Sequence, residues 1–177
     1  MAIARVFRFV LDGLYKTAAA LAALSLFGVF AIIVAQMIAR WSGQSLRGST
    51  DYAGYLMAAS SFLAFAAALN HGYHIRVTML HSLLGRRGGR WAEIWAFGVG
   101  SVIATYIAWY ACKTVWWSRK LGDLSQGLDA TPLWIPQTAM AAGAILLALA
   151  FLDNWVRLVA TGRHGVRAET SDQIPLE

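Results

Sequence analysis

The sequence is poor in charged residues. Only 14% of its 177 residues are charged and 58% are hydrophobic, with a mean hydropathy of +0.53, whereas soluble domains carry about 25% charged residues. So few charges cannot cover a soluble core, which excludes an ordinary water-soluble domain and indicates a membrane protein. At this length we expect one domain, a four-span membrane domain over residues 1–160, followed by a short polar tail over residues 161–177.

Cysteine and intramembrane acidic residues are scarce as well. Cys112 is the single cysteine, so the chain has neither an internal disulfide nor a CxxC redox pair. The long apolar segments contain no Asp or Glu, and such residues usually mark an ion or solute pathway through a membrane. We therefore expect no enzyme activity, no catalytic, substrate-binding or metal-ligating set and no cofactor. The chain is expected to support a partner that transports a solute.

Four segments are long and apolar enough to cross a bilayer. They are residues 17–39, 52–70, 94–117 and 133–152, each close to the roughly 20 residues that cross a hydrocarbon core of about 30 Å. Lys113, near the end of the third segment, is the one charged residue in them, and its long side chain can extend toward the headgroups. We predict an all-α membrane protein with four transmembrane helices.

Aromatic residues and glycines fit these spans. Seven tryptophans lie near span ends, where indole rings prefer the membrane interface: Trp41, Trp91, Trp95, Trp116, Trp117, Trp134 and Trp155. Trp109 lies deeper, and we expect it to pack between helices. Glycines within or next to the spans predict close helix packing: Gly28, Gly54, Gly98, Gly100 and Gly143.

Basic residues predict the orientation. The net charge is +6, but the charges form short clusters between apolar runs, which favours a membrane surface over nucleic acid. Three segments on one side carry most of them: Arg5, Arg8 and Lys16; Arg76, Arg86, Arg87 and Arg90; Arg157, Arg163 and Arg167. The other side holds Arg40, Arg47, Arg119 and Lys120, offset by Asp51, Asp123 and Asp129. The positive-inside rule then places both termini in the cytoplasm.

Two amphipathic segments are predicted outside the spans. Apolar residues recur at helical spacing from Ile3 to Leu14, which indicates either a helix in the cytoplasmic interface or a cytoplasmic extension of the first span. Residues 75–85 are too short to span, and we predict a second interfacial helix that ends at Gly85 and the basic turn after it. Further on, Thr131 and Pro132 are predicted to begin the fourth helix, as N-cap and first helical residue.

A polar motif, HGYHIRV, follows the second span at residues 71–77. Its histidines and Arg76 fit a helix exit, where they contact phosphates and cap carbonyls. The alternative is a haem- or quinone-associated membrane anchor subunit of a respiratory oxidoreductase. Haem in such a bundle normally requires histidines deep in facing helices, whereas His71, His74 and His81 lie in one segment.

Taken with its four spans, the sequence resembles a known family. HIRV after the second span and TPLWIP at the start of the fourth are the most specific matches. They resemble the small membrane subunit, DctQ-like, of tripartite ATP-independent periplasmic (TRAP) transporters, over about residues 10–160. Asp51 stands where the family commonly has glutamate, and Thr78 stands where an aspartate often follows the motif.

The resemblance implies a function and partners. Such transporters import organic acids across the bacterial inner membrane with a sodium gradient. A periplasmic binding protein captures the substrate, and a large multi-span subunit carries the substrate and ion sites. The small subunit would scaffold the large one and help to dock the binding protein. Asp51 would then cap the second span and pair with an arginine of the large subunit. His74 and Arg76 of the motif are candidates for a partner interface. The candidates for docking the binding protein are Arg40, Arg47, Arg119 and Lys120.

Overall fold

The described part of the chain consists of four helices and short loops. In the computed structural model, residues 2–70 and 78–161 are described, and side chains are described for residues 10–69 and 88–160. The helices are α1 (Ala2–Trp41), α2 (Ser49–Asn70), α3 (Thr78–Leu121) and α4 (Trp134–Thr161). Each contains a segment able to cross a membrane by length and composition: Val10–Trp41, Ser49–Leu69, Gly88–Leu121 and Trp134–Ala160. The predicted all-α fold with four membrane-spanning helices is confirmed.

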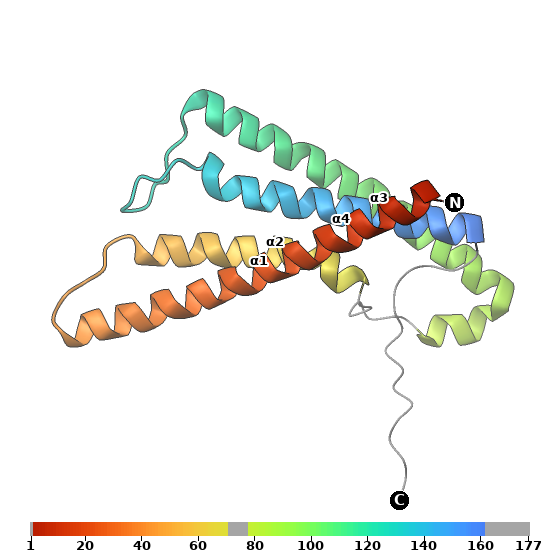
Figure 1. The fold of residues 1–177 in the computed structure, drawn as a ribbon, viewed down its shortest axis with the longest axis horizontal. Coiled ribbons are helices and arrows are strands. Elements are labelled where there is room, and N and C mark those ends of the chain that lie inside the picture. Colours follow the sequence, from red (N-terminus) through yellow and green to blue (C-terminus); the bar gives the residue numbers. More distant parts are fainter. Residues whose placement is uncertain (1, 71–77, 162–177) are drawn as a thin grey trace, which may run out of the picture.

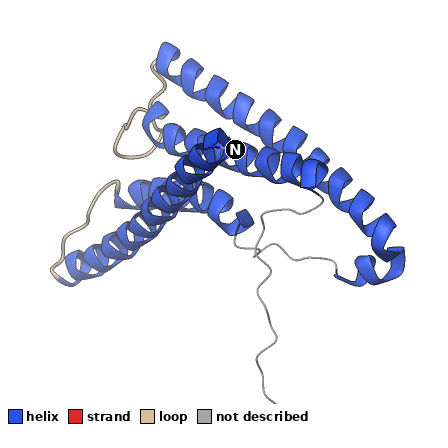
Figure 2. Cartoon of the chain, turned by 45° about the vertical axis from the view of Figure 1, so that its right-hand side comes forward, coloured by secondary structure: helices blue, strands red, loops and turns tan. Residues whose placement is uncertain are grey.

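The helices form two antiparallel hairpins that meet at α2 and α4 (Figure 1). α1 packs on α2, α3 packs on α4, and α2 packs on α4, so α1 and α3 flank the assembly. Figure 2 shows the two hairpins from a second direction. The α1–α2 loop and the α3–α4 loop lie at one end of the bundle, which we call the loop end. The N-terminus and the end of α4 lie at the opposite end.

Small residues build the contact between α1, α2 and α4. Ala18 and Ala22 are one helical turn apart on α1, and both are buried in a cluster that includes Ala66 of α2 and Ala150 of α4. The larger members are Leu11, Tyr15, Leu63, Leu69 and Leu146. Alanine at the contact lets helix backbones approach closely, which is how membrane helices gain packing energy when lipid is as apolar as leucine.

A second cluster joins α3 to α4 through alanines at i, i+4 spacing. Ala104 and Ala108 of α3 are buried with Ala144 and Ala148 of α4. Gly143, next to this cluster, lies so close to α2 that a Cβ there would overlap the backbone carbonyl of Phe62. The predicted glycine packing is confirmed for Gly143 and for Gly28, Gly98 and Gly100, which abut neighbouring helices. It is wrong for Gly54, around which a Cβ would meet nothing within 4 Å.

The structure selects one of the two alternatives for the start of α1 and corrects one predicted helix end. α1 is one continuous helix of 40 residues, so Ile3 to Leu14 extend the first span; that these turns lie in the interface stays a prediction. The predicted helix end at Gly85 is wrong, because α3 continues through the RRGGR segment to Leu121. Its first, yellow-green part runs in a different direction from the rest (Figure 1). Neighbouring glycines allow such a bend without breaking the helix.

Trp109 does not pack between helices of this chain. Its side chain is 71% exposed on α3, so that prediction is wrong within the described residues. The reason is its position on the helix, since Ala104 and Ala108 occupy the face toward α4 and Trp109 lies on a different face.

Candidate functional site

Most of the sequence-predicted site residues meet at the loop end. Arg40 lies in the last turn of α1, Arg47 lies in the first loop, and Asp51 lies in the first turn of α2. Arg119 and Lys120 are in the last turn of α3, which reaches the same end of the bundle (Figure 1). His74 and Arg76 lie outside the described residues. The loop end is therefore the candidate functional site.

Asp51 connects the start of α2 to the α3–α4 loop. Its Oδ2 accepts a hydrogen bond from the backbone N–H of Leu128 at 3.2 Å. Gly127 lies against the same carboxylate so closely that a Cβ there would overlap with Oδ2. A carboxylate in the first turn also interacts favourably with the positive end of the helix dipole. Asp51 thus has a role inside the chain, and the suggested pairing with an arginine of a partner stays a prediction.

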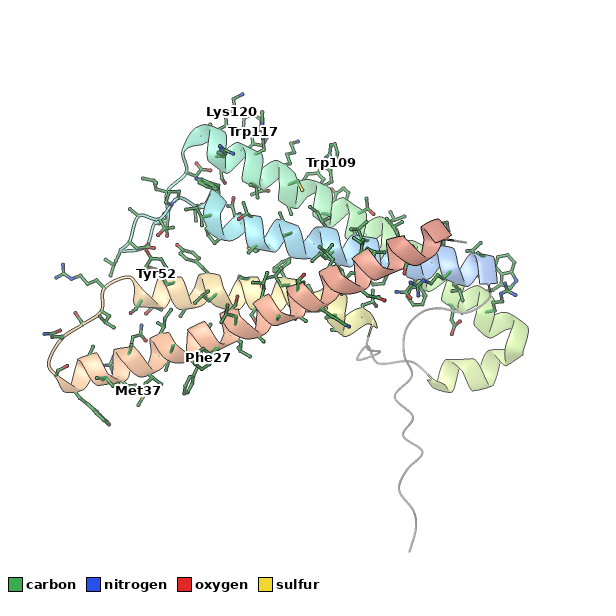
Figure 3. All side chains as sticks on the ribbon, in the orientation of Figure 1. Phe27, Met37, Tyr52, Trp109, Trp117 and Lys120 are labelled. Carbon is green, nitrogen blue, oxygen red and sulfur yellow. The ribbon has the colours of Figure 1, made fainter. Side chains whose placement is uncertain are left out.

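Two tyrosines of α2 extend this connection. The Tyr55 hydroxyl donates to Ser125 Oγ at 2.6 Å, and the Tyr52 hydroxyl lies 3.2 Å from Thr131 Oγ1. Tyr52 is labelled in Figure 3, where it lies between α2 and the α3–α4 loop. Because both bonds join residues far apart in the sequence, they fix the position of the loop relative to α2.

The α3–α4 loop is also held by its own backbone. Ser125 N–H donates to the carbonyl of Thr131 at 2.8 Å, and Leu133 N–H donates to the carbonyl of Asp123 at 3.0 Å. These bonds flank an antiparallel bridge between Leu124 and Pro132. The loop is therefore a short hairpin whose two sides are joined before α4 begins.

This hairpin displaces the start of α4 from its predicted position. Pro132 pairs with Leu124 and is not the first helical residue, since α4 begins at Trp134. Thr131 does not cap α4, because its hydroxyl donates to the carboxylate of Asp129. Pro136 lies in the first turn of α4, where its missing N–H costs little.

The four basic residues at the loop end fall into two pairs. The Arg119 guanidinium lies 5.6 Å from the Trp134 ring centroid, and the Lys120 ammonium lies 4.9 Å from that of Trp116 and 5.4 Å from that of Trp117. Cation–π contacts of this kind hold long side chains in place. Arg40 and Arg47 are exposed and form no ion pair within the described residues. All four side chains are therefore exposed, and two of them lie over aromatic rings.

Comparison with known proteins decides the family. Residues 29–161 match the sequence model of the DctQ component of tripartite ATP-independent periplasmic transporters. The chain belongs to the DctQ family. No curated protein and no solved structure shows significant similarity to it. The matched region of this DctQ-family chain contains the whole loop end, from Arg40 to Trp134.

Several residues of the loop end of this DctQ-family chain could not be predicted from the sequence. Tyr52, Tyr55, Ser125 and Gly127 carry no motif signal, since their contacts are separated by about 75 residues of sequence. The pairing of Lys120 with Trp116 and Trp117 was accessible, because residues three or four apart on a helix are neighbours.

Proposed function

We propose that this chain, as the small permease subunit of a TRAP transporter, serves a sodium-coupled importer of an organic acid. In this role it scaffolds the large membrane subunit and helps to dock the periplasmic binding protein. The observation that carries the proposal is the family match over residues 29–161. The uncharged interior supports a scaffolding role, because intramembrane charges, the usual sign of an ion or solute pathway, are nearly absent from its spans.

We propose that the loop end faces the periplasm of a bacterial inner membrane. Both termini would then be cytoplasmic, as the excess of basic residues in the N-terminal segment, the segment between α2 and α3, and the tail favours. The bundle supports this arrangement, because the α1–α2 and α3–α4 loops lie at one end and the N-terminus lies at the other (Figure 1).

The loop end has the features of a docking surface for a soluble partner. Its α3–α4 hairpin is tied to α2 by Asp51 and Tyr55, so little conformational entropy is lost when a partner binds. Arg40 and Arg47 extend into solvent, where they can steer an approaching protein of opposite charge. Arg119 and Lys120 present charges that lie over indole rings.

Charge reversal tests the docking role. We expect Arg47→Glu combined with Lys120→Glu to raise the binding protein concentration for half-maximal uptake about three- to tenfold at low ionic strength. Each exposed contact is worth about 0.2–1 kcal/mol, and salt screens it. The matched control keeps the charge at the same two positions, as Arg47→Lys combined with Lys120→Arg, and should leave the titration unchanged. Equal curves for both double variants in reconstituted vesicles would refute the docking role.

Purification from native membranes tests the assignment itself. We expect a large multi-span permease subunit to copurify with the chain in mild detergent, identified by mass spectrometry. The alternative, a haem- or quinone-associated anchor of an oxidoreductase, is not favoured by the family match. A Soret absorption band that copurifies with the chain in place of a permease subunit would favour that alternative.

A further inference from the structure

One face of α3 carries exposed aromatic and basic residues along most of the span. We call it the outer stripe of α3; its members are Trp95, Val99, Val102, Tyr106, Trp109, Tyr110, Lys113, Trp117 and Lys120. Their spacing of three or four residues places them on one side of the helix. Ala104 and Ala108, which are buried against α4, lie on the opposite side. Figure 3 shows Trp109, Trp117 and Lys120 pointing away from α4.

The tryptophans indicate how deep each part of the outer stripe lies in a bilayer. Trp95 and Trp116 are about 32 Å of helix apart, which matches a hydrocarbon core of about 30 Å whose borders tryptophan prefers. Tyr106, Trp109 and Lys113 lie between these two levels. Their polar atoms therefore fall within the hydrocarbon region.

The polar atoms at that depth need acceptors that acyl chains do not provide. The Trp109 side chain is 71% exposed and makes no hydrogen bond within the described part of the chain. Tyr106 and Tyr110 stack with ring centroids 4.6 Å apart. The Lys113 ammonium lies 5.7 Å from the ring centroid of Tyr110, a residue one helical turn nearer the middle of the span. Uncompensated polar and charged groups in lipid are costly.

Over residues 24–37, the exposed face of α1 has no polar side-chain group that lacks a hydrogen-bond partner. Leu24, Phe27, Phe30, Val34 and Met37 are exposed there and carry no hydrogen-bonding group that needs an acceptor. Phe27 and Met37 point away from α2 in Figure 3. The Ser25 hydroxyl is already satisfied, because it donates to the carbonyl of Leu21 at 2.8 Å. This surface is compatible with acyl chains alone.

We infer that the outer stripe of α3 is the surface on which the large membrane subunit packs, whereas α1 faces lipid. The partner is a membrane-spanning helix with a carboxylate or free carbonyl opposite Lys113 and a hydrogen-bond acceptor near Trp109. Charge complementarity carries this choice of occupant, since acyl chains cannot neutralise an ammonium at that depth. The inference rests on the proposed function, which supplies the large subunit.

Site-specific photocrosslinking in the copurified complex tests the assignment. A photoreactive residue at Val102 or Trp109 should crosslink to the large subunit, and the same residue at Phe27 or Met37 should not. Crosslinks from α1 in place of α3, or from α3 only to lipid or to a second copy of the chain, would overturn the inference. If the unmodified chain copurifies with no large subunit at all, the proposed function fails first, and the inference fails with it.

Substitution of Lys113 provides a second test. We expect Lys113→Met to weaken the affinity for the large subunit about tenfold, the effect of a lost charge-assisted hydrogen bond. Lys16→Met is the matched control, because Lys16 is exposed on α1, the helix inferred to face lipid; it should change the affinity less than about twofold. Equal effects of the two variants in a detergent binding titration would contradict the role of Lys113.

Discussion

Gly143 determines how closely the two helical hairpins approach each other. A Cβ at this position would overlap the backbone carbonyl of Phe62 and lie 2.8 Å from the Phe62 Cβ, whereas carbon atoms in contact are about 3.5–4.0 Å apart. Backbone atoms cannot rotate away as a side chain does. The substitution Gly143→Ala therefore requires α2 and α4 to separate by about 1 Å.

The cost of this separation can be compared with the gain in helix propensity. Replacing glycine by alanine in a helix interior stabilises by about 0.5–1 kcal/mol, but overpacking a close contact costs about 1–3 kcal/mol. The contact between α2 and α4 also joins the two hairpins, and both alanine clusters include residues of α4. We expect Gly143→Ala to lower the free energy of unfolding by up to about 2.5 kcal/mol once the gain in propensity is subtracted.

Unfolding by denaturing detergent, followed by circular dichroism, measures this change. Gly54→Ala is the matched control, because Gly54 is also in a membrane-spanning helix and a Cβ there would meet nothing within 4 Å. It should be neutral or stabilising by up to about 1 kcal/mol. If both variants unfold at the same detergent fraction, the close approach at Gly143 does not limit packing and the reasoning is refuted.

Three further predictions concern the loops. Gly127→Ala should displace the α3–α4 loop from Asp51 and cost about 1–3 kcal/mol of stability, measured by the same detergent titration. Tyr55→Phe should remove the bond to the loop and cost about 0.5–1.5 kcal/mol; hydrogen exchange of the loop should accelerate, and unchanged exchange would contradict the contact. A cysteine at Ser45 should be labelled by an impermeant thiol reagent in intact cells, whereas a cysteine at Gly88 should not; labelling at Gly88 would exclude the proposed orientation.

The spans were predictable because the bilayer imposes a simple requirement. Every backbone N–H and C=O must be satisfied within the segment that crosses it, and only apolar side chains are inexpensive there. Helix ends were less predictable. α3 begins at Thr78, well before the span predicted over residues 94–117, because backbone hydrogen bonding continues through polar sequence as easily as through apolar sequence. Gly85 and the glycines after it bend this helix without ending it.

Which helices are neighbours in the bundle could not be predicted from the sequence. The membrane-spanning segments are apolar on most of their circumference, and of the most apolar 18 residues in the α1 span only 11% are buried in the chain. Hydrophobicity therefore does not say which face packs against a neighbour. Small residues determine which faces pack together, because they let the helix backbones approach closely. Gly54 and Gly143 look alike in sequence, but of the two only Gly143 contacts another helix within the described residues.

The position of the candidate site was partly predictable, and its rigidity was not. Arg47, Asp51 and Lys120 were assigned to one side of the membrane by counting charges, and the structure brings them to one end of the bundle (Figure 1). The bonds from Asp51 and Tyr55 to the α3–α4 loop are long-range contacts that depend on the packing of α2 on α4. Such contacts cannot be predicted from the spacing of residues in the sequence.

The two proposed partner surfaces are adjacent at the end of α3. The outer stripe runs along the helix to Lys120, and Lys120 also belongs to the loop end, where a binding protein would dock. The α3–α4 loop that follows is bonded to α2 through Asp51. A large subunit packed on α3 and a soluble protein bound at the loops would therefore contact the same rigid corner of the bundle. A fixed corner of this kind would let the small subunit position a docked protein relative to the large subunit without changing its own shape.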